Sequence, residues 1–113
     1  MRRAAVLLGW ALVATIVWGS LTPSPPSINI EQSDKLGHAF FYAATMFWFA
    51  QLYLRAAVRV RYALGLVALG IALEFVQDWV GRDFELADMA ADAVGIALGW
   101  AAAVVMPMRF IPR

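Results

Sequence analysis

Residues 62–80, YALGLVALGIALEFVQDWV, form the stretch of this chain from which the fold class is best predicted. A helix needs about 20 mostly apolar residues to cross a bilayer, and this stretch supplies them. Glu74 lies within it, and nothing nearby in the sequence explains a carboxylate in so apolar a run. Because a charge in the hydrocarbon is costly, such a residue is expected to have a partner or a function. The stretch therefore predicts a transmembrane helix with a functional carboxylate.

The composition of the whole chain agrees with this interpretation. Of its 113 residues, 63% are hydrophobic and 15% are charged, whereas a soluble domain has about 45–50% apolar and about 25% charged residues. The absence of cysteine excludes disulfide scaffolds, thiolate metal sites and cysteine nucleophiles. A net charge of +1 provides no basic face for nucleic acid. The composition indicates a protein whose solvent is the bilayer.

Three further apolar stretches predict an all-α fold, an integral membrane four-helix bundle that forms one domain over residues 1–113. The four expected spans are residues 4–21, 36–54, 62–80 and 86–106. Pro23 and Pro107 follow the first and fourth spans, where proline stops a helix. Residues 1–20 also resemble a signal peptide, but the bulky Trp18 makes a poor cleavage site. We therefore expect the first span to be retained.

The basic residues predict the orientation of the spans. Those on one side are Arg2, Arg3, Arg55, Arg59, Arg61, Arg109 and Arg113. Those on the other side are Lys35 and Arg82. Loops rich in Lys and Arg stay in the cytoplasm. Both termini are therefore expected to be cytoplasmic, with the first and third loops outside.

Polar side chains within the expected spans form one stripe on each of three helices. Residues three or four apart share a helix face, because the helix has about 3.6 residues per turn. The stripes consist of Asp34, His38, Tyr42 and Thr45; of Glu74, Gln77 and Asp78; and of Asp88, Asp92, Gly95 and Gly99. The antiparallel order brings all three to one depth, in the outer third of the membrane. We therefore expect a polar pocket near the extracytoplasmic side, formed by the second, third and fourth spans.

The order and spacing of these residues resemble the VanZ-like family of small bacterial membrane proteins. The similarity is carried by Asp34-Lys35-x-x-His38-x-x-x-Tyr42, Glu74-x-x-Gln77, Arg82 and Asp88-x-x-x-Asp92-x-x-Gly95-x-x-x-Gly99. It covers residues 34–99, and one position departs from it, since the family usually has Asn in place of Asp92. The resemblance implies the bacterial inner membrane and a cell-envelope role, since the family's namesake is tied to tolerance of the glycopeptide teicoplanin. It implies no particular reaction.

The residue types of the predicted pocket suit a site that binds a lipid and acts on it. The candidate catalytic residues are His38, Glu74, Tyr42, Asp88 and Asp92, because a His beside carboxylates can act as a general acid–base. The candidate ligand-binding residues are Asp34, Lys35, Gln77, Asp78 and Arg82. A basic side chain among them could hold a phosphate. We expect a membrane lipid or a lipid-linked envelope precursor as the partner, no cofactor, and an enzyme slightly ahead of a binding protein.

Other interpretations of the same cluster stay open. It could bind its ligand without chemistry, or its charges could only hold the helices together. A divalent cation could be bound by nitrogen and oxygen ligands from His38, Glu74, Asp88 and Asp92. One His and no Cys disfavour structural zinc, and the apolar cytoplasmic halves of the spans disfavour ion transport.

Two features also have a purely structural interpretation. Asp34 could be the N-cap of the second span, because a carboxylate accepts bonds from the unpaired N–H groups of a helix start. Gly95 and Gly99 form a small-residue packing face. That face would suit a contact within the bundle or a homo-oligomer, and the pattern does not separate the two.

Overall fold

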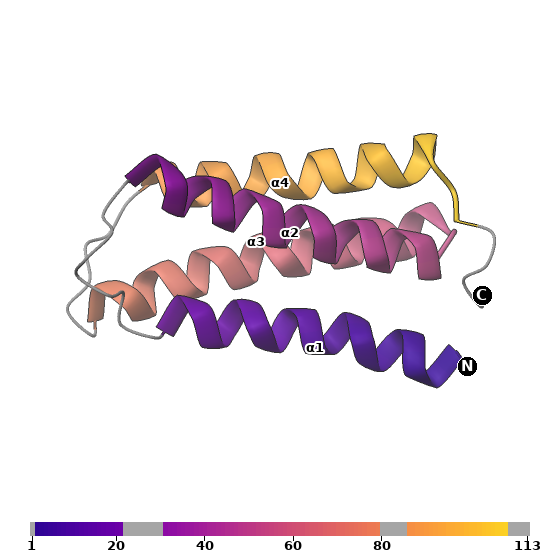
Figure 1. The fold of residues 1–113 in the computed structure, drawn as a ribbon, viewed down its shortest axis with the longest axis horizontal. Helices are drawn as coiled ribbons and strands as arrows, with labels where there is room; N and C mark the ends of the chain where they lie inside the picture. Colours follow the sequence, from indigo (N-terminus) through magenta and orange to yellow (C-terminus); the bar gives the residue numbers. More distant parts are fainter. Residues whose placement is uncertain (1, 22–30, 80–85, 109–113) are drawn as a thin grey trace.

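The structure, a computed structural model, describes residues 2–21, 31–79 and 86–108, without the side chains of residues 31–35, 77 and 78. The elements of this part are the helices α1 (Arg2–Leu21), α2 (Glu31–Leu52), α3 (Ala56–Trp79) and α4 (Leu86–Val105). They lie side by side along the long axis of the molecule (Figure 1). The all-α prediction is confirmed for the described part of the chain.

Successive helices run in opposite directions, which gives the molecule two chemically different ends (Figure 1). The end with the start of α1, the turn between α2 and α3 and the end of α4 is called the arginine end here. It takes its name from Arg2, Arg3, Arg55, Arg59 and Arg61. The opposite end, with the end of α3 and the starts of α2 and α4, is called the acidic end. Glu74, Asp88 and Asp92 lie in the half of the molecule next to it.

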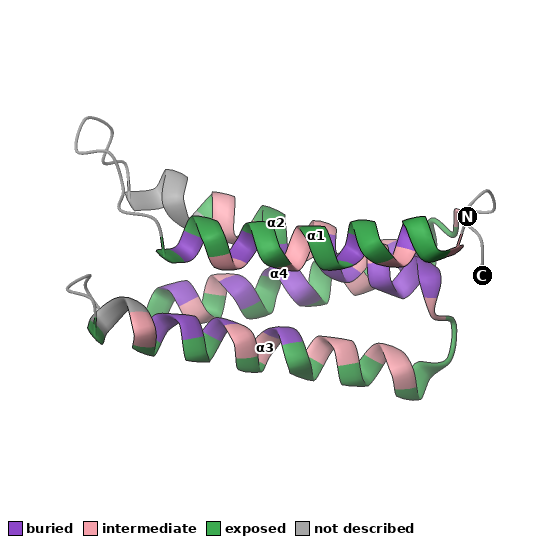
Figure 2. Cartoon of the chain, turned by 90° about the horizontal axis from the view of Figure 1, so that it is seen from below, coloured by how far each residue is buried: buried purple, intermediate pink, exposed green. Residues whose placement is uncertain are grey.

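Three of the four helices, α1, α3 and α4, are long and apolar enough to cross a membrane. At about 1.5 Å per residue, helices of 20 to 24 residues match the ~30 Å hydrocarbon core. Large apolar side chains on their outer faces are exposed, among them Leu7, Leu64 and Leu98, and the outward faces of α1 and α3 are visibly exposed in Figure 2. This part of the membrane prediction is confirmed.

α2 is not among these three helices, because polar residues occur along it from Glu31 to Gln51. Like α3, it packs against all three other helices, and its contact with α4 is the most extensive. The largest fully buried side chains of the described chain all belong to it: Tyr42, Thr45, Met46, Phe49, Gln51 and Leu52. The exposed side chains described on α2, Leu36, Phe40 and Phe41, are apolar, whereas the polar Thr45 and Gln51 are buried, so this helix can be more polar than its neighbours.

Two helices extend beyond the predicted spans. α2 begins at Glu31 rather than at residue 36, so Asp34 lies inside the helix and is not its N-cap. α3 begins at Ala56 rather than at residue 62, so Arg59 and Arg61 are helical and do not belong to the second loop. Residues 31–35 are all polar, and residues 56–61 combine apolar side chains with Arg59 and Arg61, so neither stretch is an uninterrupted apolar run, although Ala and Arg are good helix formers.

Arg59 has a structural reason to lie on α3. Its guanidinium donates to the carbonyls of Ala50, at 2.7 and 3.1 Å, and Tyr53, at 2.9 Å. Arg2 of α1 donates to the carbonyl of Leu52 at 3.4 and 3.5 Å. The last carbonyls of a helix have no partner within it, and cationic side chains suit its negative end. Arg2 from α1 and Arg59 from α3 therefore cap the C-terminal end of α2.

α2 and α4 form the closest helix pair, because small residues face each other between them. A Cβ added to Gly95 would collide with the backbone of Ala39, and one added to Gly99 with the backbone of Ala43. Both glycines are buried. The glycine face predicted from the sequence is therefore used within one chain, and the structure adds no support for a homo-oligomer through it.

Candidate functional site

The centre of the site is a histidine–carboxylate pair that joins α2 to α4. His38 Nδ1 lies 3.2 Å from Asp92 Oδ1, and the two side chains are 16% and 6% exposed. With Asp92 ionised, the Nδ1–H donates to the carboxylate and fixes the imidazole in one tautomer and orientation. The sequence stripes of α2 and α4 thus meet as predicted at these two residues.

α3 closes the site through Gly70. A Cβ added there would lie 2.8 Å from Asp92 Oδ2 and 3.4 Å from the Tyr42 hydroxyl oxygen. Only a glycine lets the α3 backbone come this close to the carboxylate and the phenol. Asp92 therefore faces His38 with one oxygen and the backbone of α3 with the other. Sequence reasoning missed Gly70, although a glycine within an apolar helical run often marks such a close approach.

Two further predicted residues lie one helical turn nearer the acidic end. Glu74 is one turn beyond Gly70 on α3 and is only 2% exposed. Both its carboxylate and that of Asp92 act electrostatically on Tyr42, which is 1% exposed. Asp88 lies one turn before Asp92 on α4 and is buried. All five residues predicted to be catalytic are therefore in the described part, on α2, α3 and α4 near the acidic end.

A cavity of about 310 Å³ reaches this site from the side of α1. Its lining from α2 includes Gly37, His38 and Tyr42. Its lining from α1 includes the hydroxyl residues Thr15 and Ser20 beside Gly19. The predicted pocket between the second, third and fourth spans needs correction, because the first helix forms one wall of this cavity. α3 and α4 lie behind His38 and Tyr42.

Sequence reasoning missed the contribution of α1 for a physical reason. Thr15 and Ser20 are ordinary in an apolar helix, since a hydroxyl can bond back to its own backbone. Thr15 does so, with its hydroxyl donating to the Ala11 carbonyl at 2.8 Å. Thr45 of the α2 stripe likewise donates to the Phe41 carbonyl at 2.8 Å. Thr15 and Thr45 therefore make the same kind of hydrogen bond, and the two residues differ in that Thr15 lies beside the cavity.

The predicted ligand-binding residues are only partly described. The backbones of Asp34, Lys35, Gln77 and Asp78 belong to α2 and α3 at the acidic end, and their side chains are not described. Arg82 lies outside the described residues. These five residues stay predictions as ligand contacts.

In the described ranges, no three His, Asp or Glu side chains gather so that they could hold a metal ion. His38 and Asp92 form a pair, and the carboxylates of Glu74 and Asp88 do not complete a metal site with them. The arrangement suits proton exchange and hydrogen bonding to a ligand. It offers no support for the cation alternative.

No protein-family model, curated protein or solved structure matches this chain. The VanZ-like resemblance therefore rests on the motif residues alone.

Proposed function

We propose that this chain is a VanZ-like protein of the bacterial inner membrane that crosses the bilayer four times with both termini in the cytoplasm. The fourth crossing is α2, which can span despite its polar residues because residues 42–52 are enclosed by the other helices and its exposed side chains, Leu36, Phe40 and Phe41, are apolar. Polar groups in membrane helices face the protein interior in this way. The exposed apolar faces of α1, α3 and α4 support contact with lipid.

Within this placement, the polar site binds the headgroup of a lipid or of a lipid-linked envelope precursor. One observation carries the proposal: His38 lines a cavity of about 310 Å³ and is held from behind by the buried Asp92. The cavity volume lies in the ~300–1,000 Å³ range of small-molecule sites. Exposed Trp18 and Phe41 belong to the same lining, so apolar side chains and His38 would meet one amphipathic ligand.

The site acts on this ligand by general acid–base catalysis. The Asp92 carboxylate orients the imidazole through Nδ1, so Nε2 is the nitrogen that exchanges a proton with the ligand. Carboxylate–imidazole pairs are a common way to fix the reactive tautomer. Tyr42 supplies a hydroxyl that can donate to developing negative charge. A hydrolytic or proton-transfer step fits these groups better than acyl-enzyme chemistry, which needs an activated nucleophile.

Native mass spectrometry of the gently solubilised protein tests the ligand site. A Cβ at Gly19 would meet nothing within 4 Å, so Gly19→Leu fills the cavity without a collision at the helix backbone. Val94→Leu is the matched control, because Val94 is exposed on α4 and does not line this cavity. We expect the wild type and the control to share an adduct that Gly19→Leu and Glu74→Gln lose. The same adduct on all four proteins would contradict the site.

A second measurement separates an enzyme from a binding protein. Given the ligand identified on the wild type, His38→Ala and Tyr42→Phe should lower its conversion by about 10²–10⁴-fold, the usual contribution of general acid–base groups. Full conversion by either variant would exclude its acid–base role. Cells that produce the wild type should also tolerate more teicoplanin than cells that produce His38→Ala at the same level.

A further inference from the structure

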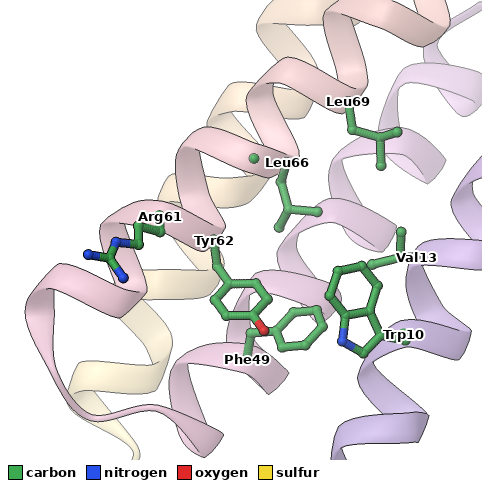
Figure 3. A pocket seen from close by; sticks show the side chains of 8 residues that line it. Trp10, Val13, Phe49, Arg61, Tyr62, Leu66 and Leu69 are labelled. Atoms are coloured by element: carbon green, nitrogen blue, oxygen red, sulfur yellow. The ribbon is translucent and has the colours of Figure 1, made fainter.

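A second cavity, of about 370 Å³, lies between α1, α2 and α3 in the half of the molecule towards the arginine end (Figure 3). Its apolar wall is formed by Trp10, Val13, Phe49, Tyr62, Leu66 and Leu69. Gly65 and Arg61 complete the lining. We call this cavity the aromatic groove. It shares no lining residue with the cavity beside His38.

Packed aromatic rings form one side of the groove. The rings of Phe49 and Tyr62 stack with centroids 4.2 Å apart and an interplanar angle of 20°. Trp10 meets Phe49 edge-on at 5.6 Å, and Figure 3 shows the three side chains together below Leu66. Space remains beside them, because a Cβ added to the exposed Gly65 would meet nothing within 4 Å. The side chains that enclose the groove therefore leave it open at Gly65.

The charges around this groove have one sign. Arg61 lies at one end of it, with its guanidinium directed away from the aromatic rings (Figure 3). Arg3 and Arg55 are also exposed at the arginine end. Every Asp and Glu of the chain falls within residues 31–34, 74–78 or 83–92. The groove is thus an apolar channel with a positively charged rim. No carboxylate of the described residues lies near it to compete for that charge.

The length of the groove fits one leaflet of a bilayer. From Arg61 to Leu69, eight residues along α3 correspond to about 12 Å at ~1.5 Å per residue. Half of the ~30 Å hydrocarbon core is about 15 Å. An acyl chain that entered between α1 and α3 would run past Gly65, while its phosphate would stay near Arg61 at the interface.

We propose that the aromatic groove binds an acyl chain of an anionic phospholipid from the leaflet at the arginine end, with the lipid phosphate near Arg61. The inference rests on the membrane placement of the proposed function and not on the chemistry at His38. Charge complementarity selects the anionic headgroup, because juxtamembrane Arg residues attract anionic lipids. The apolar aromatic wall selects a hydrocarbon chain rather than a soluble anion.

Native mass spectrometry of the delipidated protein, titrated with dioleoyl phosphatidylglycerol or dioleoyl phosphatidylcholine, tests this inference. We expect the wild type to retain the anionic lipid about fivefold better, the effect of one Arg near a membrane surface. Arg61→Gln should remove that preference, and Gly65→Leu should lower retention of both lipids about tenfold. Val94→Leu is the matched control and should retain both lipids like the wild type, because Val94 is exposed on α4 and lines neither cavity.

Several results would overturn the proposal. The wild type could retain the two lipids equally, or Gly65→Leu could retain them as well as the wild type does. The wild type could also form a dimer that carries no lipid and that the Gly65→Leu substitution dissociates. Loss of lipid from Gly19→Leu alone would place the binding at the His38 cavity instead.

A spectroscopic measurement keeps the test independent of the Gly65 variant. Phosphatidylglycerol with a brominated acyl chain should quench the fluorescence of the wild type more than that of Trp10→Phe, since Trp10 lines the groove. Equal quenching of the two proteins would contradict a chain bound beside Trp10. Neither measurement depends on catalysis at His38, so failure here leaves the proposed function intact.

Discussion

At the scale of single residues, Asp92 is where three helices meet. Its Oδ1 lies at His38 of α2, and its Oδ2 faces the α3 backbone at Gly70. A carboxylate buried to this extent loses its solvation by water and depends on such neighbours. Asp92 therefore sets the position of His38 and the distance between α3 and α4 at the same time.

Substitution of Asp92 should separate hydrogen bonding from charge. Asp92→Asn keeps a side-chain oxygen that can accept from His38 Nδ1, whereas Asp92→Leu removes the acceptor. We expect Asp92→Leu to lower the free energy of unfolding by about 1–3 kcal/mol, the cost of a buried polar group left unsatisfied. Asp92→Asn should lose less. His38 is the only histidine, so its ¹⁵N resonances report directly whether Nδ1 remains a donor.

Gly70 offers a test of the close approach itself. Gly70→Ala should displace Asp92, because the new methyl group would lie 2.8 Å from its Oδ2. The His38 resonances should therefore shift, and ligand conversion should fall with them. Gly65→Ala is the matched control on the same helix, with open space around the new methyl group. Identical His38 spectra for the two variants would show that α3 adjusts without strain.

At the scale of the helices, the contact between α2 and α4 depends on glycines. Gly99→Ala should destabilise the protein by about 1–3 kcal/mol, the usual cost of overpacking, because its methyl group collides with the Ala43 backbone. Gly37→Ala has open space, so it should gain up to about 1 kcal/mol of helix propensity. Thermal unfolding in detergent measures both. A lower midpoint for Gly37→Ala than for Gly99→Ala would contradict the packing.

The helices themselves were predictable, because long apolar runs leave few alternatives to a membrane helix. Their boundaries were less so: residues 31–35 are helical without any apolar residue, and residues 56–61 are helical although two arginines interrupt their apolar residues. Arg59 is held there by carbonyls at the end of α2 and just after it. The glycine periodicity predicted a packing face. The residues that pack against this face, Ala39 and Ala43 of α2, could not be predicted, since small residues in any helix could have packed there.

At the scale of the whole molecule, α1 is fixed at one end and lines a cavity at the other. Near the arginine end, Trp48 Nε1 donates to the Ala5 carbonyl at 2.7 Å, and a Cβ on Gly9 would lie 2.7 Å from the Phe49 ring. Near the acidic end, α1 borders the cavity beside His38. The three polar stripes could be predicted from helical spacing. The role of α1 could not, because it depends on which helix lies beside α2.

The number of crossings is decided by the side on which the ends of α2 lie. With four crossings and a cytoplasmic N-terminus, Leu21 and Trp79 lie outside and Arg55 lies inside. If α2 does not cross, Arg55 lies outside and Trp79 inside. The chain has no cysteine, so Leu21→Cys, Arg55→Cys and Trp79→Cys can each be labelled on intact cells with an impermeant maleimide. All three native side chains are exposed, Trp79 to 87%.

We expect labelling of Leu21→Cys and Trp79→Cys and protection of Arg55→Cys until the cells are lysed. Labelling of Leu21→Cys and Arg55→Cys with protection of Trp79→Cys would instead leave α2 on the outer side. It would also place the His38 site outside the bilayer core, where the buried His38–Asp92 pair would need no lipid ligand to explain it.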